Sequence, residues 1–528
     1  MNPIRTSVLL LGFLAIANVS ASGDEPPAKS KDDKEDSKSK KPRGKWTLGK
    51  DTTCISEPLD KDGYVDYVTA LNKRLSRDVT PDSNACVPLW NVFGPRPEGR
   101  NVPPEFFQLL GIEPPPEKGD YFVNFTAYLK EHWNIKEVKY DDPIYRQFER
   151  ATKRPWKEKD CPQLAGWLKA NEKPLAVVCQ AVKRANYYSP LVPAKPDNGL
   201  IGSMVQGTQE CRGWAKALTA RAMLRTAQGA YDEAWQYLLA CHRLGRLVGR
   251  GGTLIDSHVG FAIENLASTA DLAFLDWSGL NAKRVEACLR DLQKLPPIAP
   301  VADNVDLMER FMFHDSVMKV DRQGLRFIDS DYNDPLDDKV LEGIDWDPAL
   351  RNANRWYDRF VAAMREKDRA VRDQKLKEAD HEFRSASARF VVFSWHREKV
   401  LLADDKTRGD LVGQLLLRFF LPNILQVQDS ADRAKQTFDN TVVAFALLWY
   451  QRDRGLYPKQ LSELAPKYLD QVPPDLFSGQ ALIYRPTVSG YLLYSVGLNG
   501  KDEEGRSHDD EPQGDDLSVR MPLPELRK

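Results

Sequence analysis

Four apolar patterns with the spacing of α-helices follow one another between residues 205 and 296. They cover Glu210–Gln228, Tyr231–Val248, Leu254–Asp276 and Ala282–Leu295. The breaks between and after them contain glycine or proline: Gly229, Gly249-Arg-Gly-Gly252, Ser278-Gly279 and Pro296-Pro297. Helices joined by short connections pack as antiparallel neighbours. We therefore expect two helical hairpins here, within a mainly α chain.

The C-terminal region has a different pattern. Apolar residues recur at helical spacing over Ala431–Arg452, and Pro473-Pro474 then excludes helix. Two short runs with strand character, Ala481–Arg485 and Tyr491–Val496, bracket the turn Ser489-Gly490. This order predicts a small α+β module: a helix, a loop, a β-hairpin and an acidic loop.

The motifs of this module resemble the globular part of type II secretion major pseudopilins. They are Arg-Asp-Arg-Gly-Leu-Tyr-Pro (452–458), Pro-Pro-Asp-Leu-Phe-Ser-Gly-Gln (473–480) and Leu-Tyr-Ser-Val-Gly-Leu-Asn-Gly (493–500), within residues 429–521. The resemblance implies a module whose relatives pack into periplasmic fibres and bind calcium in the final loop. A standard pilus subunit is not expected, because the segment before this module is internal and is broken by Arg418 and Pro422.

The final loop supplies the candidate metal ligands of the chain. They are Asn499, Asp502, Asp509, Asp510, Asp515 and Asp516. Calcium binds six to eight oxygen atoms from carboxylates and carbonyls, so these side chains are possible ligands. Two positions that are acidic in the family's calcium site hold Leu492 and Asn499 here. The alternative is a solvated acidic loop without a metal.

The first helical hairpin resembles a tetratricopeptide repeat. Ala222, the run Gln228-Gly-Ala-Tyr-Asp-Glu-Ala234 and Leu238 match the turn and packing positions of that repeat. A repeat of this kind implies protein partners. A single repeat does not make a stable array, so an ordinary helical bundle is the alternative.

The N-terminus predicts export. Met1–Ala21 contains Arg5, an apolar core and the small-residue sequence Val19-Ser20-Ala21, which is typical of a secretory signal peptide. Residues 22–45 are highly charged and poor in apolar side chains, which predicts a disordered linker. No later stretch has the roughly 20 uninterrupted apolar residues of a membrane span. We expect a periplasmic or secreted bacterial protein.

The remaining chain divides into four predicted regions. Residues 46–204 form a loop-rich, mainly helical region and 205–296 the helical hairpins. Residues 297–428 form a charged helical region, in which Trp356, Phe360, Met364 and Val371 indicate one long amphipathic helix. Residues 429–528 form the pseudopilin-like module with its acidic loop.

The sequence contains no nucleophile elbow, phosphate-binding loop, dinucleotide fingerprint or zinc-protease motif. Cys241-His242 with His258 is a conceivable thiol site, and His314-Asp315 a conceivable metal-ligand pair. Adjacency in sequence does not orient a nucleophile toward a base, and no spacing supplies a third ligand. The seven cysteines contain no Cys-x-x-Cys pair, and we interpret those in helical patterns as buried free thiols.

The charge balance, 75 Lys and Arg against 76 Asp and Glu, gives no electrostatic reason to expect nucleic acid. We expect an exported, non-enzymatic binding or scaffold protein of the cell envelope. Its helical hairpins and terminal module would contact other envelope or secreted proteins. Two alternatives stay open: an extracytoplasmic enzyme whose site is assembled from distant residues, and a terminal module that is only a structural cap.

Overall fold

The structure is a computed structural model that describes residues 42–99, 101–139, 141–203, 207–327, 335–391, 400–421 and 424–526. The predicted signal peptide and most of the predicted linker lie outside these residues. The end of that linker is ordered, contrary to the prediction. The backbone amides of Arg43 and Gly44 donate to the Asp321 carboxylate at 3.0 and 2.7 Å, which holds this segment against a helix.

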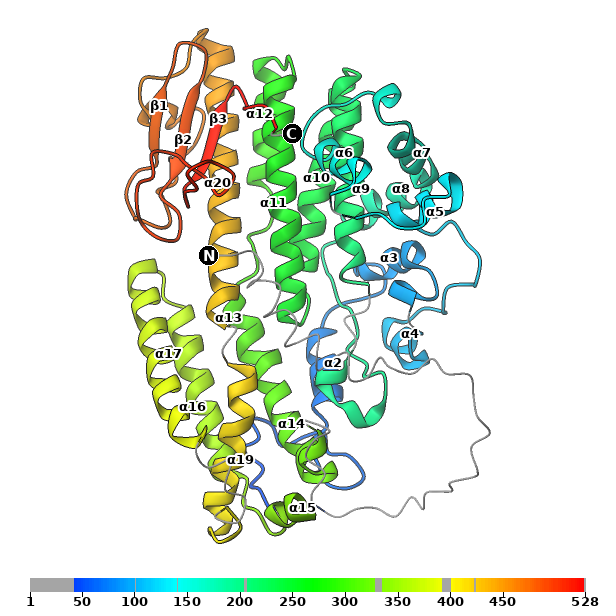
Figure 1. The fold of residues 1–528 in the computed structure, drawn as a ribbon, viewed down its shortest axis with the longest axis vertical. Helices are drawn as coiled ribbons and strands as arrows, with labels where there is room; N and C mark the ends of the chain where they lie inside the picture. Colours follow the sequence, from blue (N-terminus) through cyan, green and yellow to red (C-terminus); the bar gives the residue numbers. More distant parts are fainter. Residues whose placement is uncertain are drawn as a thin grey trace.

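The described chain is mainly helical, with one small antiparallel sheet near its C-terminal end (Figure 1), and this confirms the predicted fold class. Most long helices run along the long axis of the molecule. Buried apolar side chains form two clusters, which we call the upper core and the lower core from their places in Figure 1. No helix among the described residues is both long and apolar enough to span a membrane.

The predicted helical hairpins form the centre of the upper core. They are α9 (Glu210–Ala227), α10 (Tyr231–Val248), α11 (Leu254–Trp277) and α12 (Ala282–Gln293). Each boundary lies within two residues of its predicted position. Gly229 turns the first hairpin with a φ of +77°, which only glycine adopts readily. Thr253 begins α11 with a reciprocal capping box to Asp256.

Short helices of the N-terminal region cover one side of this bundle. They are α3 (Cys86–Phe93), α4 (Pro104–Leu110), α5 (Phe125–Trp133), α6 (Pro143–Ala151), α7 (Pro162–Ala170) and α8 (Glu172–Ala181). The earlier helix α2 (Tyr67–Leu75) belongs to the lower core instead. Single 3-10 turns lie at 97–99, 158–160, 196–198, 200–202, 325–327 and 461–464.

The lower core is built by helices of the charged region. They are α13 (Val301–Asn304), a π-helical turn (Val305–Glu309), α14 (Arg310–Gln323), α15 (Pro335–Leu341), α16 (Asp347–Met364), α17 (Arg369–Val391) and α19 (Asp405–Phe420). The single long helix predicted from Trp356 to Val371 is wrong. The chain breaks at 365–368, where the Asp368 carboxylate accepts the backbone amide of Val371 and starts a new helix.

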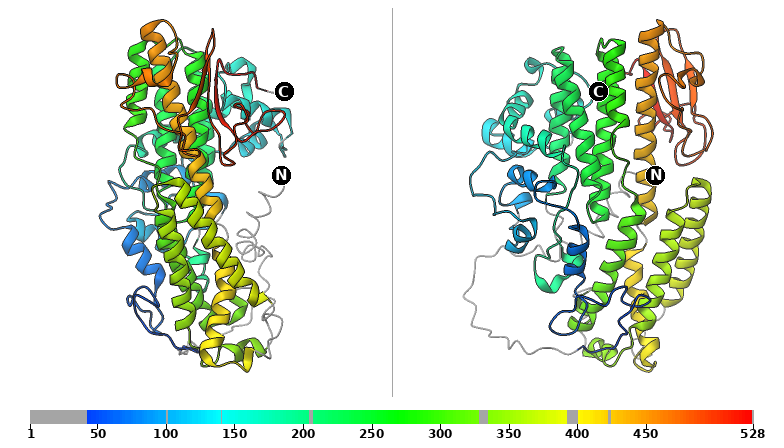
Figure 2. Two further views of the ribbon diagram at one scale, coloured as in Figure 1. Left: turned by 90° about the vertical axis from the view of Figure 1, so that its left-hand side faces the viewer. Right: turned by 180° about the vertical axis from the view of Figure 1, so that it is seen from behind.

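One helix joins the two cores. α20 (Ile424–Arg454) is 31 residues long and runs past both sets of helices (Figures 1 and 2). Ile424, Val427 and Ala434 belong to the lower core, whereas residues 443–449 belong to the upper core. α20 packs against α11 and α12 of the same chain.

The sheet has the order β1 (Ile483–Pro486), β2 (Tyr491–Ser495), β3 (Leu517–Met521), with both pairs antiparallel. The predicted hairpin is confirmed, with Ile483 opposite Tyr494. The third strand was not predicted; it places Val519 opposite Leu493. β2 and β3 pack on α20, so the module is attached along the helix that precedes it.

A close crossing of α10 and α11 gives a first testable prediction. A Cβ atom at Gly260 would lie 2.6 Å from the Cα atom of Gly249 and 2.8 Å from the carbonyl oxygen of Gly245. Because the obstructing atoms are backbone, we expect Gly260→Ala to lower the free energy of unfolding by about 2 kcal/mol. Denaturant unfolding measures this, with Gly279→Ala, which meets nothing within 4 Å, as the control. Equal stability of Gly260→Ala and Gly279→Ala would contradict the close backbone approach of α10 and α11.

Candidate functional site

The acidic loop, residues 497–516, covers one face of the sheet. Leu493 on β2 belongs to the upper core, so the alternating residues Leu492 and Tyr494 lie on the opposite face. A Cβ atom at Gly505 of the loop would lie 3.0 Å from the Leu492 side chain and 3.3 Å from that of Tyr494. The loop therefore lies directly on these two residues, on the face of β2 opposite the upper core.

The structure divides the predicted metal ligands into two groups. In the first, Asp510 accepts two hydrogen bonds from the Arg520 guanidinium, at 3.0 and 2.9 Å. The bond from Arg520 holds the pKa of Asp510 well below its usual range. Asp509 is exposed beside it. An arginine thus occupies the position that a cation would take next to Asp510.

The second group gathers Asn499, Asp502, Asp515 and Asp516. The Asn499 backbone amide donates to Asp515 Oδ2 at 2.9 Å. The second oxygen of Asp515 is ion-paired with Arg433 of α20. Asp502 accepts the Tyr494 hydroxyl at 3.0 Å. These contacts explain how the loop is held without requiring a metal.

Asp516 is the exception among the candidates. It is 1% exposed, and its Oδ2 accepts the backbone amides of Glu503 and Gly505 at 3.1 and 2.7 Å, but its Oδ1 has no partner. Burial, with the nearby carboxylates of Glu503 and Asp502, raises the pKa of Asp516 to about 6. Within the described ranges, no group of three or more His, Cys, Asp or Glu side chains is arranged to hold a metal ion.

These features predict how Asp516 affects stability. A carboxyl whose pKa is higher in the folded than in the unfolded protein stabilises the fold when it is protonated. For Asp516 this stabilisation is complete below about pH 4 and is lost as the pH rises through about 6. Asp516→Asn keeps an acceptor for the two amides without the charge. We expect it to raise the free energy of unfolding at pH 8 by about 1 kcal/mol, after allowance for solvent screening.

Thermal unfolding between pH 4 and pH 8 is the measurement for Asp516→Asn, and Asp509→Asn is the matched control in the same loop. Millimolar calcium added at pH 8 tests the metal separately. If calcium binds here, it raises the melting temperature of the wild type but not that of Asp516→Asn. A variant with unchanged pH dependence would contradict the role of Asp516.

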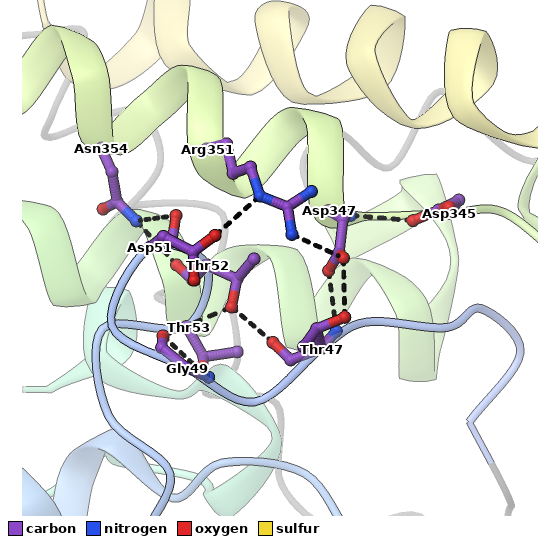
Figure 3. A network of polar contacts seen from close by, with 9 residues as sticks. All are labelled: Thr47, Gly49, Asp51, Thr52, Thr53, Asp345, Asp347, Arg351 and Asn354. Atoms are coloured by element: carbon purple, nitrogen blue, oxygen red, sulfur yellow. Dashed lines mark hydrogen bonds and ion pairs between the residues drawn. The ribbon is translucent and has the colours of Figure 1, made fainter.

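A second polar cluster lies in the lower core, where the N-terminal segment 47–54 contacts α16 (Figure 3). The Asn354 side-chain amide donates to the carbonyls of Asp51 and Thr52 at 3.0 and 2.7 Å. Arg351 binds Asp51 at 2.9 Å and Asp347 at 3.1 Å. These contacts hold the segment in one place and orient the Asn354 amide.

Cys54, His314 and Asn354 converge at the end of this segment. Cys54 Sγ lies 3.4 Å from His314 Nε2 and 3.1 Å from Asn354 Oδ1, and Nε2 lies 2.9 Å from the same oxygen. Cys54 has a φ of +63°, a strained conformation that is often found at functional sites. Cysteine, histidine and asparagine are also the residue types of one class of nucleophilic site.

The hydrogen bonds define the protonation of this cluster. The Asn354 amide nitrogen is committed to two carbonyls, so its Oδ1 is the acceptor and His314 Nε2 carries a proton. That nitrogen cannot also accept the proton of the Cys54 thiol. Burial raises the pKa of Cys54 to about 11 and lowers that of His314 to about 4. The cluster therefore rests as a neutral thiol and a neutral imidazole.

The histidine sites considered from the sequence are not assembled. The Cys241 thiol donates to the Ala215 carbonyl, and burial raises the pKa of this thiol far above its usual range. His258 packs against Phe261. His314 and Asp315 have separate partners, since Asp315 Oδ2 accepts the Leu200 amide at 2.7 Å. Cys179, Cys211, Cys241 and Cys288, the cysteines in helical patterns, form no disulfide, as predicted; the last three are buried and Cys179 is half-buried.

A third cluster is buried between α10 and α11. The two His242 ring nitrogens lie 2.9 Å from Glu264 Oε1 and 2.9 Å from Asp271 Oδ2. Arg246 donates to both oxygens of Glu264, at 3.1 and 2.8 Å. Burial opposes the imidazolium, but the two carboxylates outweigh it and raise the pKa of His242 to about 10. This cluster contains two cations and two carboxylates whose charges balance internally.

Two solvent-open hollows lie apart from the Cys54 and His242 clusters, and the first shares Arg351 with the polar contacts of segment 47–54. One, about 570 Å³, lies between α16 and α19 and is lined by Pro348, Arg351, Asn352, Arg355, Lys406, Thr407, Asp410 and Gln414. The other, about 520 Å³, follows α6 and includes Arg146 and Arg150. The buried titratable groups described above therefore line neither hollow.

No family model, curated protein or solved structure matches this chain. The resemblances to pseudopilins and to tetratricopeptide repeats are therefore untested by comparison and stay predictions. Function has to be inferred from the chain's own surfaces and contacts.

Proposed function

We propose that this chain is an exported, non-enzymatic binding or scaffold protein of the bacterial cell envelope, which contacts protein partners through its helical hairpins and terminal module. The observation that carries this proposal is the exposure of two large apolar side chains at the ends of α11 and α20. Trp277 is 55% exposed and Leu456 is 60% exposed. Exposed tryptophan is enriched at protein interfaces and supplies a large share of binding energy.

The two exposed residues belong to one end of the molecule. Arg452, near the end of α20, donates to the Leu280 carbonyl at 2.9 Å, just beyond the end of α11. Asp276, which precedes Trp277, accepts the backbone amide of Leu523 from the C-terminal tail at 3.3 Å. Hairpin and terminal module therefore meet here, which supports a surface shared by both.

The packing of α20 supports a scaffold rather than a fibre subunit. The pseudopilin resemblance implies relatives that assemble into fibres, but in this chain α11 and α12 already cover α20. The module therefore offers its acidic loop to solvent instead, with Asp502, Glu504 and Asp509 exposed. This arrangement is equally compatible with the alternative in which the module serves only as a structural cap.

Cross-linking of tagged protein in its native envelope, followed by purification and mass spectrometry, tests the proposal. We expect envelope or secreted proteins to be recovered with the wild type and lost with Trp277→Ala. Trp133→Ala, which removes a 44% exposed tryptophan from α5, is the matched control. Recovery of the protein alone, or equal recovery with both variants, would overturn the proposal. The mass of the purified N-terminal peptide tests export, with a start near Ser22 expected.

The extracytoplasmic enzyme is the second candidate, and the convergence of Cys54, His314 and Asn354 is the observation that favours it. Its test is the alkylation rate of Cys54 at neutral pH. A rate above that of an unstructured thiol would indicate an activated nucleophile. The raised pKa and the bond to Asn354 instead lead us to expect slow alkylation.

A further inference from the structure

The π-helical turn Val305–Glu309 lies where the two cores meet. It follows α13, which contacts α11 and α20 as well as α16, and it leads directly into α14 (Figure 1). A π turn inserts an extra residue into a helix, has less favourable hydrogen bonding than an α-helix, and is frequent at functional sites. The less favourable hydrogen bonding of this turn, at the junction of the two cores, needs a physical explanation.

The last residue of this turn is an isolated buried acid. Glu309 is 2% exposed, and its Oε2 has no hydrogen-bond partner. The polar contact between this residue and α16 uses the backbone instead, because the Tyr357 hydroxyl donates to the Glu309 carbonyl at 3.1 Å. An ionised carboxylate in this position would lack both water and a counter-ion, so the interior favours the protonated form. Burial correspondingly raises the pKa of Glu309 to about 7.

The charged groups around this turn are engaged with one another. Arg310, on α14, binds Asp306 of the turn and Asp358 of α16, each at 2.7 Å. Arg365 at the end of α16 binds Asp303 of α13 at 3.2 Å and Asp306 at 2.9 Å. Tyr357 remains neutral, since burial raises its pKa far above its usual range. A proton is therefore the available means of neutralising Glu309.

We propose that this π turn is a proton-operated switch at the junction of the two cores, with Glu309 as the group that binds the proton. With Glu309 protonated, the turn stays packed against α16. When Glu309 ionises, its carboxylate leaves the apolar interior for water, and the turn and the start of α14 open together. The step exchanges one proton with solvent and needs no other reactant. It does not depend on the proposed binding function.

Hydrogen exchange of the full chain, read by mass spectrometry over peptides covering residues 301–323, tests the switch. After correction for the intrinsic exchange rate, we expect protection of this segment to fall about tenfold between pH 6 and pH 8. This factor follows from linkage, with a pKa of about 7 in the closed state and an ordinary pKa of 4.5 in the open state. Glu309→Gln should keep the same protection at both pH values.

Asp315→Asn is the matched control, because it neutralises another buried carboxyl of α14, one that already has the Leu200 amide as a partner. This variant should retain the tenfold change of the wild type. If Glu309→Gln does not fold, Glu309→Met provides an apolar side chain of similar length that cannot titrate. Equal protection of the wild type at pH 6 and pH 8, or the same loss in a folded Glu309 variant, would overturn the proposal.

Discussion

Glu264→Ala is expected to lower the free energy of unfolding by about 3 to 5 kcal/mol, the cost typical of breaking a buried ion pair. Glu264 accepts from His242 at 2.9 Å and twice from Arg246, at 3.1 and 2.8 Å. Its loss leaves two buried cations with Asp271 as the one carboxylate of the cluster. The cost therefore comes from uncompensated buried charge rather than from lost packing.

Denaturant unfolding at pH 7 measures this cost. Asp232→Ala is the matched control, since it removes the exposed partner of Arg284 and should change stability by about 0 to 1 kcal/mol. Similar losses for Glu264→Ala and Asp232→Ala would show that the cluster contributes no more than a surface ion pair.

The same cluster predicts a pH dependence. His242 titrates near 6.5 in the unfolded chain and near 10 in the folded protein. A raised pKa of this kind gives a stabilisation that is complete below about pH 6.5 and is lost as the pH rises through 10. Stability should therefore decline between pH 7 and pH 10, and less steeply in Glu264→Ala, which has lost one of the two carboxylates that favour the imidazolium.

Asn354→Ala is expected to lower the free energy of unfolding by about 3 kcal/mol, at about 1 kcal/mol or less for each of four buried or partly buried hydrogen bonds. The substitution leaves the carbonyls of Asp51 and Thr52 without their donor and removes the acceptor shared by Cys54 and His314. Since these bonds hold segment 47–54 on α16, we also expect faster proteolytic cleavage in that segment.

Asn352→Ala, two residues away on α16, is the matched control for Asn354→Ala. Its amide nitrogen makes one long contact to Asp410, 3.4 Å, at a partly exposed position, and its oxygen accepts from Arg355 at an exposed one. Unfolding and limited proteolysis of both variants give the comparison. An Asn354→Ala protein as stable and as resistant as Asn352→Ala would show that the segment is held by other contacts.

Helices with strong periodicity were predictable from the sequence. α9 to α12 were found because their apolar spacing and their glycine breaks are local signals. The hairpin β1–β2 was found for the same reason. β3 was missed because Leu517–Met521 is a five-residue strand that follows a long acidic run, and only its pairing with β2 identifies it.

The polar clusters were not predictable, because their members are distant in sequence. Cys54 and His314 are separated by 260 positions, and Asn354 lies 40 positions beyond His314. The strained backbone of Cys54 has no sequence signature. In the acidic loop the candidate ligands were visible in the sequence, but their partners were not. Its composition suggested metal ligands, whereas two of them, Asp515 and Asp510, pair with Arg433 and Arg520.

The long helix that joins the two cores also determines when, during synthesis, the chain can complete its folding. α20 is the last long helix in this sequence, and both cores need side chains from it. Neither core is complete until residues 424–454 are available, however early the preceding helices form. A chain interrupted before Ile424 would leave apolar surface exposed in both halves and be open to proteolysis along most of its length. The placement of α20 thus makes protease resistance a property of chains whose synthesis has reached the terminal module.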